Sequence, residues 1–90
     1  MKILDAQETA ALLPFQALAE ELRAVLLDKR AGKAAAPPRL HVPLASDGVL
    51  LVMPAADDSL AITKLVTVHP QNARYDLPSV QAEVLVFGIE

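Results

Sequence analysis

The fold is decided by residues 39–68, which read RLHVPLASDGVLLVMPAADDSLAITKLVTV. From Arg39 onward the hydrophobic pattern has a period of two, which is typical of β-strands. Ala45-Ser46-Asp47-Gly48 is a turn-rich connection of the kind that joins two strands of a hairpin. Loops are expected at residues 69–72 and 74–78. The pattern predicts an antiparallel meander with strands at Arg39 to Leu44, Val49 to Pro54, Leu60 to Val68 and Val80 to Phe87.

Two helices are predicted before the strands. Asp5 with Glu8 three residues later matches a capping box, so a short helix should follow. Pro14 suits the first turn of a second helix, because a missing N–H costs nothing there. Gly32 is a suitable terminator for that helix, and the proline-containing segment 33–38 should leave it as a linker within the domain.

Helices first and an antiparallel meander second indicate an α+β fold, with the helices packed on the sheet. Ninety residues form one small domain, residues 1–90, whose isolated core would be marginal. The chain is 53% hydrophobic and only 3% aromatic. This balance predicts that another subunit or domain normally covers part of its apolar surface.

Charge and composition exclude several classes of function. The net charge is −3 and the eight Lys and Arg residues form no basic stripe, which disfavours nucleic-acid binding. Without cysteine the chain can form neither disulfides nor cysteine-based zinc sites. The start lacks the features of a secretory signal, and the longest apolar run, Val49 to Ala56, is too short to span a bilayer. We therefore expect a soluble, cytoplasmic protein without membrane partners.

Lys64 is the most informative side chain. Alternation places it on the same face as Ile62 and Val66, where an ammonium needs an anion or a hydrogen-bonding partner. A substrate carboxylate would serve; alternatively Lys64 lies at a sheet edge and its ammonium reaches water. Arg39 follows two prolines, a stiff setting for bidentate capture of a carboxylate, although a surface arginine after a linker is the commoner case. Met53 suits either the lining of a pocket or a gap in the core.

Other chemistry-bearing residues give weaker signals. His41 and His69 have no ligand-spaced partner, so no metal site is expected. Asp57-Asp58 is typical of a turn, and nothing beside it makes it catalytic. With glycines only at positions 32, 48 and 88, the chain has no G-x-G-x-x-G dinucleotide turn. The residues by themselves name no reaction.

Ordered segments along residues 38–90 carry a likeness to a known family. They are Pro38 to Pro43, Gly48 to Ala55, Lys64 to Asn72, Leu77 to Ala82 and Val84 to Phe87. Together they resemble the N-terminal domain of the ornithine cyclodeaminase and mu-crystallin family, and the leading helices fit the same scheme more loosely. The resemblance implies an NAD(P)-dependent enzyme. Its first domain binds substrate and forms a homodimer through the β-sheet, completing a barrel-like sheet, and a following Rossmann domain holds NAD(H) or NADP(H).

The resemblance also implies roles for particular residues. In the family, residues matching Arg39 and Lys64 hold the substrate carboxylate, and a methionine matching Met53 lines the same pocket. Leu51 departs from the pattern, because ornithine cyclodeaminases carry a glutamate there, and leucine can neither accept a proton nor pair with an amine. A small amino or imino acid is implied as substrate, with ornithine in doubt and a ketimine reductase or alanine dehydrogenase-like enzyme as alternatives.

The family's Rossmann domain, a later arginine and a catalytic aspartate have no counterpart in residues 1–90. We therefore expect this chain alone to hold no catalytic residue, to bind no cofactor and to be inactive, as part of a longer parent enzyme. Two other interpretations stay open: a free-standing, non-catalytic dimeric binding module, and a domain of unrelated purpose with a borrowed fold.

Overall fold

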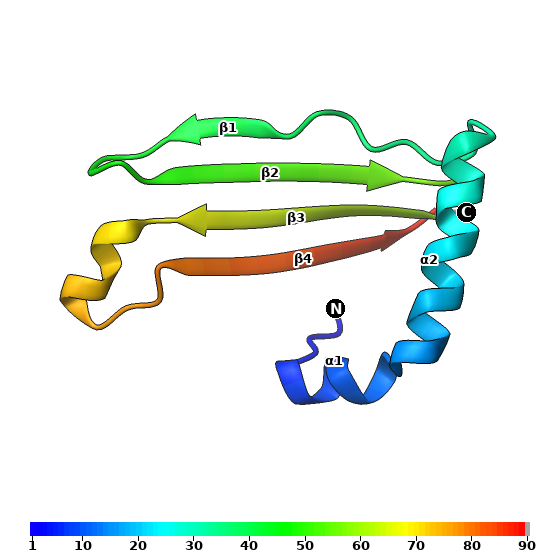
Figure 1. The fold of residues 1–90 in the computed structure, drawn as a ribbon, viewed down its shortest axis with the longest axis horizontal. Helices are drawn as coiled ribbons and strands as arrows, with labels where there is room; N and C mark the ends of the chain where they lie inside the picture. The colour runs from blue at the N-terminus through cyan, green and yellow to red at the C-terminus, as the bar shows by residue number, and fades with distance from the viewer. Residues whose placement is uncertain (90) are drawn as a thin grey trace. The chain divides into compact units, whose positions relative to one another are not determined.

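The computed structural model describes residues 1–89. It divides into two compact units, Met1–Gly32 and Lys33–Glu90, whose elements are drawn in Figure 1. Each unit is described by itself, and the packing of helices on the sheet stays a prediction. No helix among the described residues has the length and apolar character needed to cross a bilayer.

The first unit consists of helix α1 (Ala6–Leu12) and helix α2 (Phe15–Arg30). The predicted capping box is confirmed, since the Asp5 carboxylate accepts from the Glu8 N–H at 2.8 Å and the Glu8 carboxylate accepts from the Asp5 N–H at 3.4 Å. Pro14 is the N-cap of α2, with an extended ψ of 136°, and not a residue of its first turn. The prediction was wrong by one position, because a residue without an N–H fits either place.

Helix α2 ends at Arg30, and Gly32, the predicted terminator, follows two residues later. The glycine has a φ of +80°, and its N–H donates to the Lys29 carbonyl at 3.1 Å. Lys29 and Arg30 lie in the last turn, where positive charge complements the helix dipole. A left-handed glycine closing the last turn is the usual end of a helix.

The second unit is a four-stranded antiparallel sheet in which neighbours in the sequence are neighbours in space (Figure 1). The meander is confirmed, and every strand lies within two residues of its predicted bounds. The strands, in the spatial order β1-β2-β3-β4, are β1 (Leu40–Pro43), β2 (Val49–Ala56), β3 (Leu60–Val68) and β4 (Val80–Gly88).

The turn between β1 and β2 packs against the end of β3. A Cβ on Gly48 would lie only 3.1 Å from both Cγ and Nε2 of His69 and closer still to its Cδ2, so the imidazole fills the space that a side chain would need. The His69 Nε2 lies 2.9 Å from the Ala45 carbonyl oxygen. Because a carbonyl oxygen only accepts, Nε2 carries the hydrogen in this contact. The ring thereby joins two segments that are distant in the sequence.

The connection between β3 and β4 contains a 3-10 helix, η1 (Pro70–Tyr75), where loops had been predicted. Pro70 pre-sets the backbone of its first turn, and Asp76, with a left-handed φ of 60°, ends it. The Asn72 side chain donates to the Pro78 carbonyl at 3.0 Å and holds the remaining loop. The prediction was wrong because so short a helix has no hydrophobic period to reveal it.

The strand register assigns each side chain to one face of the sheet, since directly opposed residues of antiparallel strands share a face. Lys64 opposes Met53 and Val84, and Val66 opposes Leu51 and Ala82. We call this side of the sheet the Lys64 face. Val66 is its best-buried side chain, with 6% of its surface exposed.

Candidate functional site

Lys64 lies in the middle of β3, an inner strand of the sheet. Met53 of β2 and Val84 of β4 are its direct cross-strand partners. Backbone hydrogen bonds to β2 and β4 therefore hold the backbone of Lys64 in place, while its side chain is exposed. The alternative in which Lys64 belongs to an edge strand is wrong, and its ammonium projects from a mainly apolar part of this face, between Met53 and Val84.

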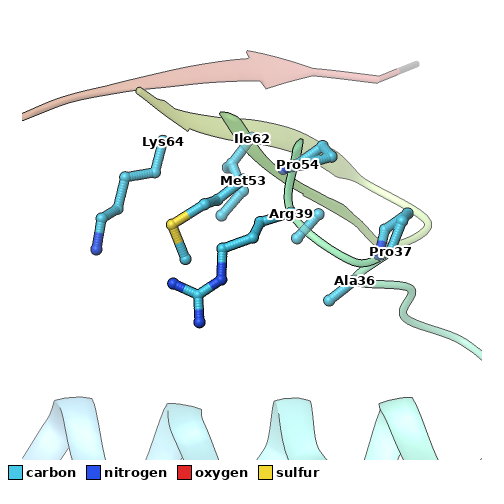
Figure 2. Close-up of a pocket in the computed structure, with 8 residues that line it drawn as sticks. Ala36, Pro37, Arg39, Met53, Pro54, Ile62 and Lys64 are labelled. Carbon is cyan, nitrogen blue, oxygen red and sulfur yellow. The ribbon is translucent and has the colours of Figure 1, made fainter. Parts of the chain in front are cut away.

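Arg39 reaches the same face from the neighbouring chain segment. It immediately precedes β1, whose first residue, Leu40, opposes Val52. Alternation from Leu40 directs Arg39 to the side of Met53. Figure 2 shows the side chains of Arg39, Met53 and Lys64 extending to one side of the sheet. The structure thus brings together all three residues that the sequence singled out.

These three residues line one open cavity of about 370 Å³, a size within the range of small-molecule sites. No acidic residue lines it among the residues that the structure describes, and its other surfaces are apolar. Two cations without a lining acid favour an anionic ligand, while the apolar surfaces favour a compact hydrocarbon part. The cavity is lined by Ala36, Pro37, Arg39, Met53, Pro54, Ala55, Ile62 and Lys64.

Some lining residues were not identified from the sequence. Ile62 precedes Lys64 by two positions and was expected on the same face, so strand alternation was sufficient to find it. Ala55 opposes Ile62 and follows from the register of β2 and β3. Ala36 and Pro37 carry no such signal, because they lie in the irregular segment before β1.

Asp57 lies in the turn between β2 and β3, as predicted. Its carboxylate accepts from the backbone N–H groups of Ser59 and Leu60, both at 2.8 Å, and from the Ser59 hydroxyl at 3.2 Å. The hydrogen bond from the Ser59 N–H, followed by that from Leu60, holds the pKa of this carboxyl below its usual value. These contacts give Asp57 a structural role in the turn.

Within residues 1–89, no three His, Asp or Glu side chains converge to hold a metal ion. His41 lies on the Lys64 face opposite Leu51, whereas His69 is engaged by the Ala45 carbonyl oxygen. The cavity beside Arg39 and Lys64 is the candidate site.

Comparisons with known proteins agree on one family. A model of the ornithine cyclodeaminase/mu-crystallin family matches residues 1–90. Delta(1)-pyrroline-2-carboxylate reductase 1 of Burkholderia multivorans is 45% identical over 83 residues, which cover 92% of this chain and 27% of that protein. A Delta(1)-pyrroline-2-carboxylate/Delta(1)-piperideine-2-carboxylate reductase of Azospirillum brasilense is 41% identical over 85 residues, covering 94% of this chain and 27% of that protein. This chain therefore spans about a quarter of the length of these relatives.

Solved structures show the same relationship. Delta(1)-pyrroline-2-carboxylate reductase of Thermococcus litoralis, in complex with NADH and L-proline, superimposes with a TM-score of 0.69 at 28% identity, covering 97% of this chain and 25% of that one. An archaeal alanine dehydrogenase dimer with bound NAD superimposes with a TM-score of 0.62 at 33% identity, covering 68% of this chain and 19% of that one.

Proposed function

This chain belongs to the ornithine cyclodeaminase/mu-crystallin family, and from that premise we propose that it forms the substrate-carboxylate site of an NAD(P)H-dependent reductase of a small cyclic imino acid. The substrate class is that of Δ1-pyrroline-2-carboxylate, the compound named in several of its relatives. The cofactor is assigned to residues outside 1–90, since this chain has no glycine-rich dinucleotide turn.

The observation that carries the proposal is the convergence of Arg39 and Lys64 on a cavity without a lining acid. The planar guanidinium of Arg39 can donate two parallel hydrogen bonds to a carboxylate, and the Lys64 ammonium adds a compact positive charge. Met53 lies opposite Lys64 and supplies an apolar, polarisable surface for a ring. An imino acid of five or six ring atoms combines the anionic and apolar parts that these groups would recognise.

In the proposed reaction, the nicotinamide supplies a hydride to C2 of the imine, and a proton is added to the ring nitrogen, giving the cyclic amino acid. Arg39 and Lys64 hold the carboxylate attached to that carbon and so fix one end of the substrate. Their positive charge also withdraws electron density from C2 and makes it a better hydride acceptor. Orientation of this kind is among the largest contributions that a binding site makes to catalysis.

Leu51 supports imine reduction over ornithine cyclodeamination. It lies on the Lys64 face, where it opposes Val66, the next residue of β3 after Lys64 on that face. Its isobutyl group offers hydrocarbon surface but no partner for a second substrate ammonium, which would lose hydration there without compensation. A cyclic imine with a hydrocarbon ring meets no such cost.

The proposal is tested on the complete protein that the gene encodes. We expect oxidation of NADH or NADPH when Δ1-pyrroline-2-carboxylate is added. Lys64→Met and Arg39→Ala should each raise KM by at least about 10- to 150-fold, the effect of losing one charge-assisted hydrogen bond, and Arg39→Ala should have the larger effect because it removes two. The Kd for the cofactor should be unchanged. Arg74→Ala is the matched control, because Arg74 lies in η1, outside the cavity. A normal KM for both cavity variants would remove these residues from the site.

Alanine dehydrogenase activity is a second candidate, favoured by the structural similarity to the archaeal alanine dehydrogenase. Alanine has the same carboxylate but a methyl group in place of a ring. The same protein should therefore be assayed for alanine-dependent reduction of NAD or NADP. A kcat/KM for alanine above that for Δ1-pyrroline-2-carboxylate would favour this candidate.

We also propose that two copies of this chain associate through the sheet, next to β4. Among the described residues, the outer edge of β4 pairs with no strand, and an unpaired edge is a template for another chain. The side chains of Val80, Val84, Val86 and Phe87 are between 56% and 61% exposed, which is unusual for a strand that faces only water. Light scattering should give a mass of two chains. A single-chain mass at high concentration would contradict this.

A further inference from the structure

The segment before β1 contains one residue more than the strand that it faces. Ala35 and Ala56 form an isolated antiparallel bridge, closed by two backbone hydrogen bonds of 2.8 and 2.9 Å. The next regular pair is Leu40 with Val52. Between these two pairs lie four residues, 36–39, on one chain and three residues, 53–55, on the other. An excess of one residue between paired positions makes a strand bend out of the sheet, as in a β-bulge.

The lining of the cavity shows where this extra length goes. Three of the four residues between the two pairs, Ala36, Pro37 and Arg39, line the cavity. Figure 2 shows the side chains of Ala36 and Pro37 on the segment that borders the cavity. The one-residue excess falls in this segment, and the segment forms a wall of the cavity.

Prolines stiffen this wall without ladder hydrogen bonds. Pro37 and Pro38 have no N–H to donate, and neither does Pro54 on the facing strand. Each proline ring fixes its own φ, and Pro38 restricts the residue before it to extended conformations. The segment leading into Arg39 is thus held by covalent geometry where the sheet cannot hold it.

We propose that residues 36–39 are a positioning element, in which the one-residue excess brings Ala36 and Pro37 to the wall of the cavity, and the two prolines stiffen the backbone that carries the Arg39 guanidinium towards the Lys64 ammonium. This inference rests on the proposed function, because it assigns the substrate carboxylate to the space between the two cations. Pro37 and Pro38 act through Arg39 and are positioning residues.

The test is deletion of Pro38 in the complete gene product. The deletion leaves three residues on each chain between the Ala35–Ala56 and Leu40–Val52 pairs. We expect KM for Δ1-pyrroline-2-carboxylate and Kd for L-proline, measured by calorimetry, to rise by about tenfold or more, since small misplacements of a binding group have effects of this size. In an Arg39→Ala background the deletion should raise KM by less than a further factor of about two, because two changes that act through one group are not additive.

A second variant covers the case in which the deletion fails to fold. Pro37→Gly combined with Pro38→Gly keeps the residue count and frees the backbone, and it should raise KM by several-fold. Pro43→Ala is the matched control, because Pro43 belongs to β1 but does not line the cavity. It should leave KM unchanged.

The outcomes separate the two proposals. A wild-type protein that neither binds L-proline nor reduces Δ1-pyrroline-2-carboxylate would overturn the proposed function and the positioning role together. Normal wild-type binding with an unchanged KM in a folded deletion or double-glycine variant would overturn the positioning role alone. The same holds if the Pro38 deletion weakens binding equally with and without Arg39.

Discussion

Gly48→Ala is expected to destabilise the sheet, although it adds only a methyl group. The new Cβ would lie 3.1 Å from two ring atoms of His69 and nearer still to a third, whereas carbon atoms at ordinary contact are about 3.5–4.0 Å apart. Positive φ among the glycines occurs at Gly32 and not at Gly48, so the backbone itself tolerates alanine there. The whole cost therefore comes from moving the imidazole.

Three terms set the magnitude. Forcing a methyl group into a filled space costs about 1–3 kcal/mol. Displacing the His69 ring also breaks its 2.9 Å hydrogen bond to the Ala45 carbonyl, a loss of about 0.5–1.5 kcal/mol. The reduced entropy of the unfolded alanine chain offsets about 0.4–1 kcal/mol. We expect a net loss of about 2–3 kcal/mol in the free energy of unfolding.

Urea unfolding followed by circular dichroism measures this loss. Gly88→Ala is the matched control, because a Cβ there has nothing within 4 Å, and its stability should equal or slightly exceed that of wild type. His69→Ala should remove the clash, so that Gly48→Ala costs less than about 0.5 kcal/mol in that background. A Gly48→Ala protein as stable as wild type, or an equal cost with and without the imidazole, would refute the reasoning.

Two further predictions concern the turn and the cavity. The lowered pKa of folded Asp57 means that its ionised form stabilises the turn; this contribution is complete at neutral pH and is lost as pH falls through the folded pKa. The stability difference between wild type and Asp57→Ala should therefore shrink in acid, and a difference independent of pH would contradict the assignment. Leu51→Glu adds a carboxylate to the Lys64 face and should raise KM for Δ1-pyrroline-2-carboxylate about fivefold, for roughly 1 kcal/mol of charge interaction, while improving binding of ornithine. An unchanged ratio of the two affinities would place Leu51 outside the site.

Much of the fold could be predicted from the sequence because its signals are local. The capping box at Asp5 and Glu8 and the terminal Gly32 are each made by residues within one helical turn, and both were found. The four strands were found because alternation and turn residues repeat along each of them. The 3-10 helix after β3 was missed, since proline and asparagine there favour a loop equally well.

The site was predictable in part. Lys64 was identified because an ammonium on an apolar strand face conflicts with its surroundings, and that conflict is visible in one strand alone. The pairing of Met53 with Lys64 depends on the register between two strands, which alternation does not specify. The place of Ala36 and Pro37 in the cavity wall depends on the one-residue excess of their segment over the strand it faces. That excess is counted between the backbone pairs Ala35–Ala56 and Leu40–Val52. Such a count exists only once the register is known.

The two cations of the cavity are consequently held by different means. Lys64 stands on an inner strand, where ladders on both sides fix its backbone and that of Met53 together. Arg39 belongs to a segment that faces Pro54, which has no N–H to donate to it. The backbone of this segment is therefore held by the fixed φ angles of its own prolines and not by ladder hydrogen bonds. Changes in the ladder should therefore disturb both residues of the Met53–Lys64 pair, whereas changes in residues 36–39 should disturb Arg39 alone. Because a carboxylate gripped from two sides needs both donors at a fixed separation, its affinity can be lost through either support while the other stays intact.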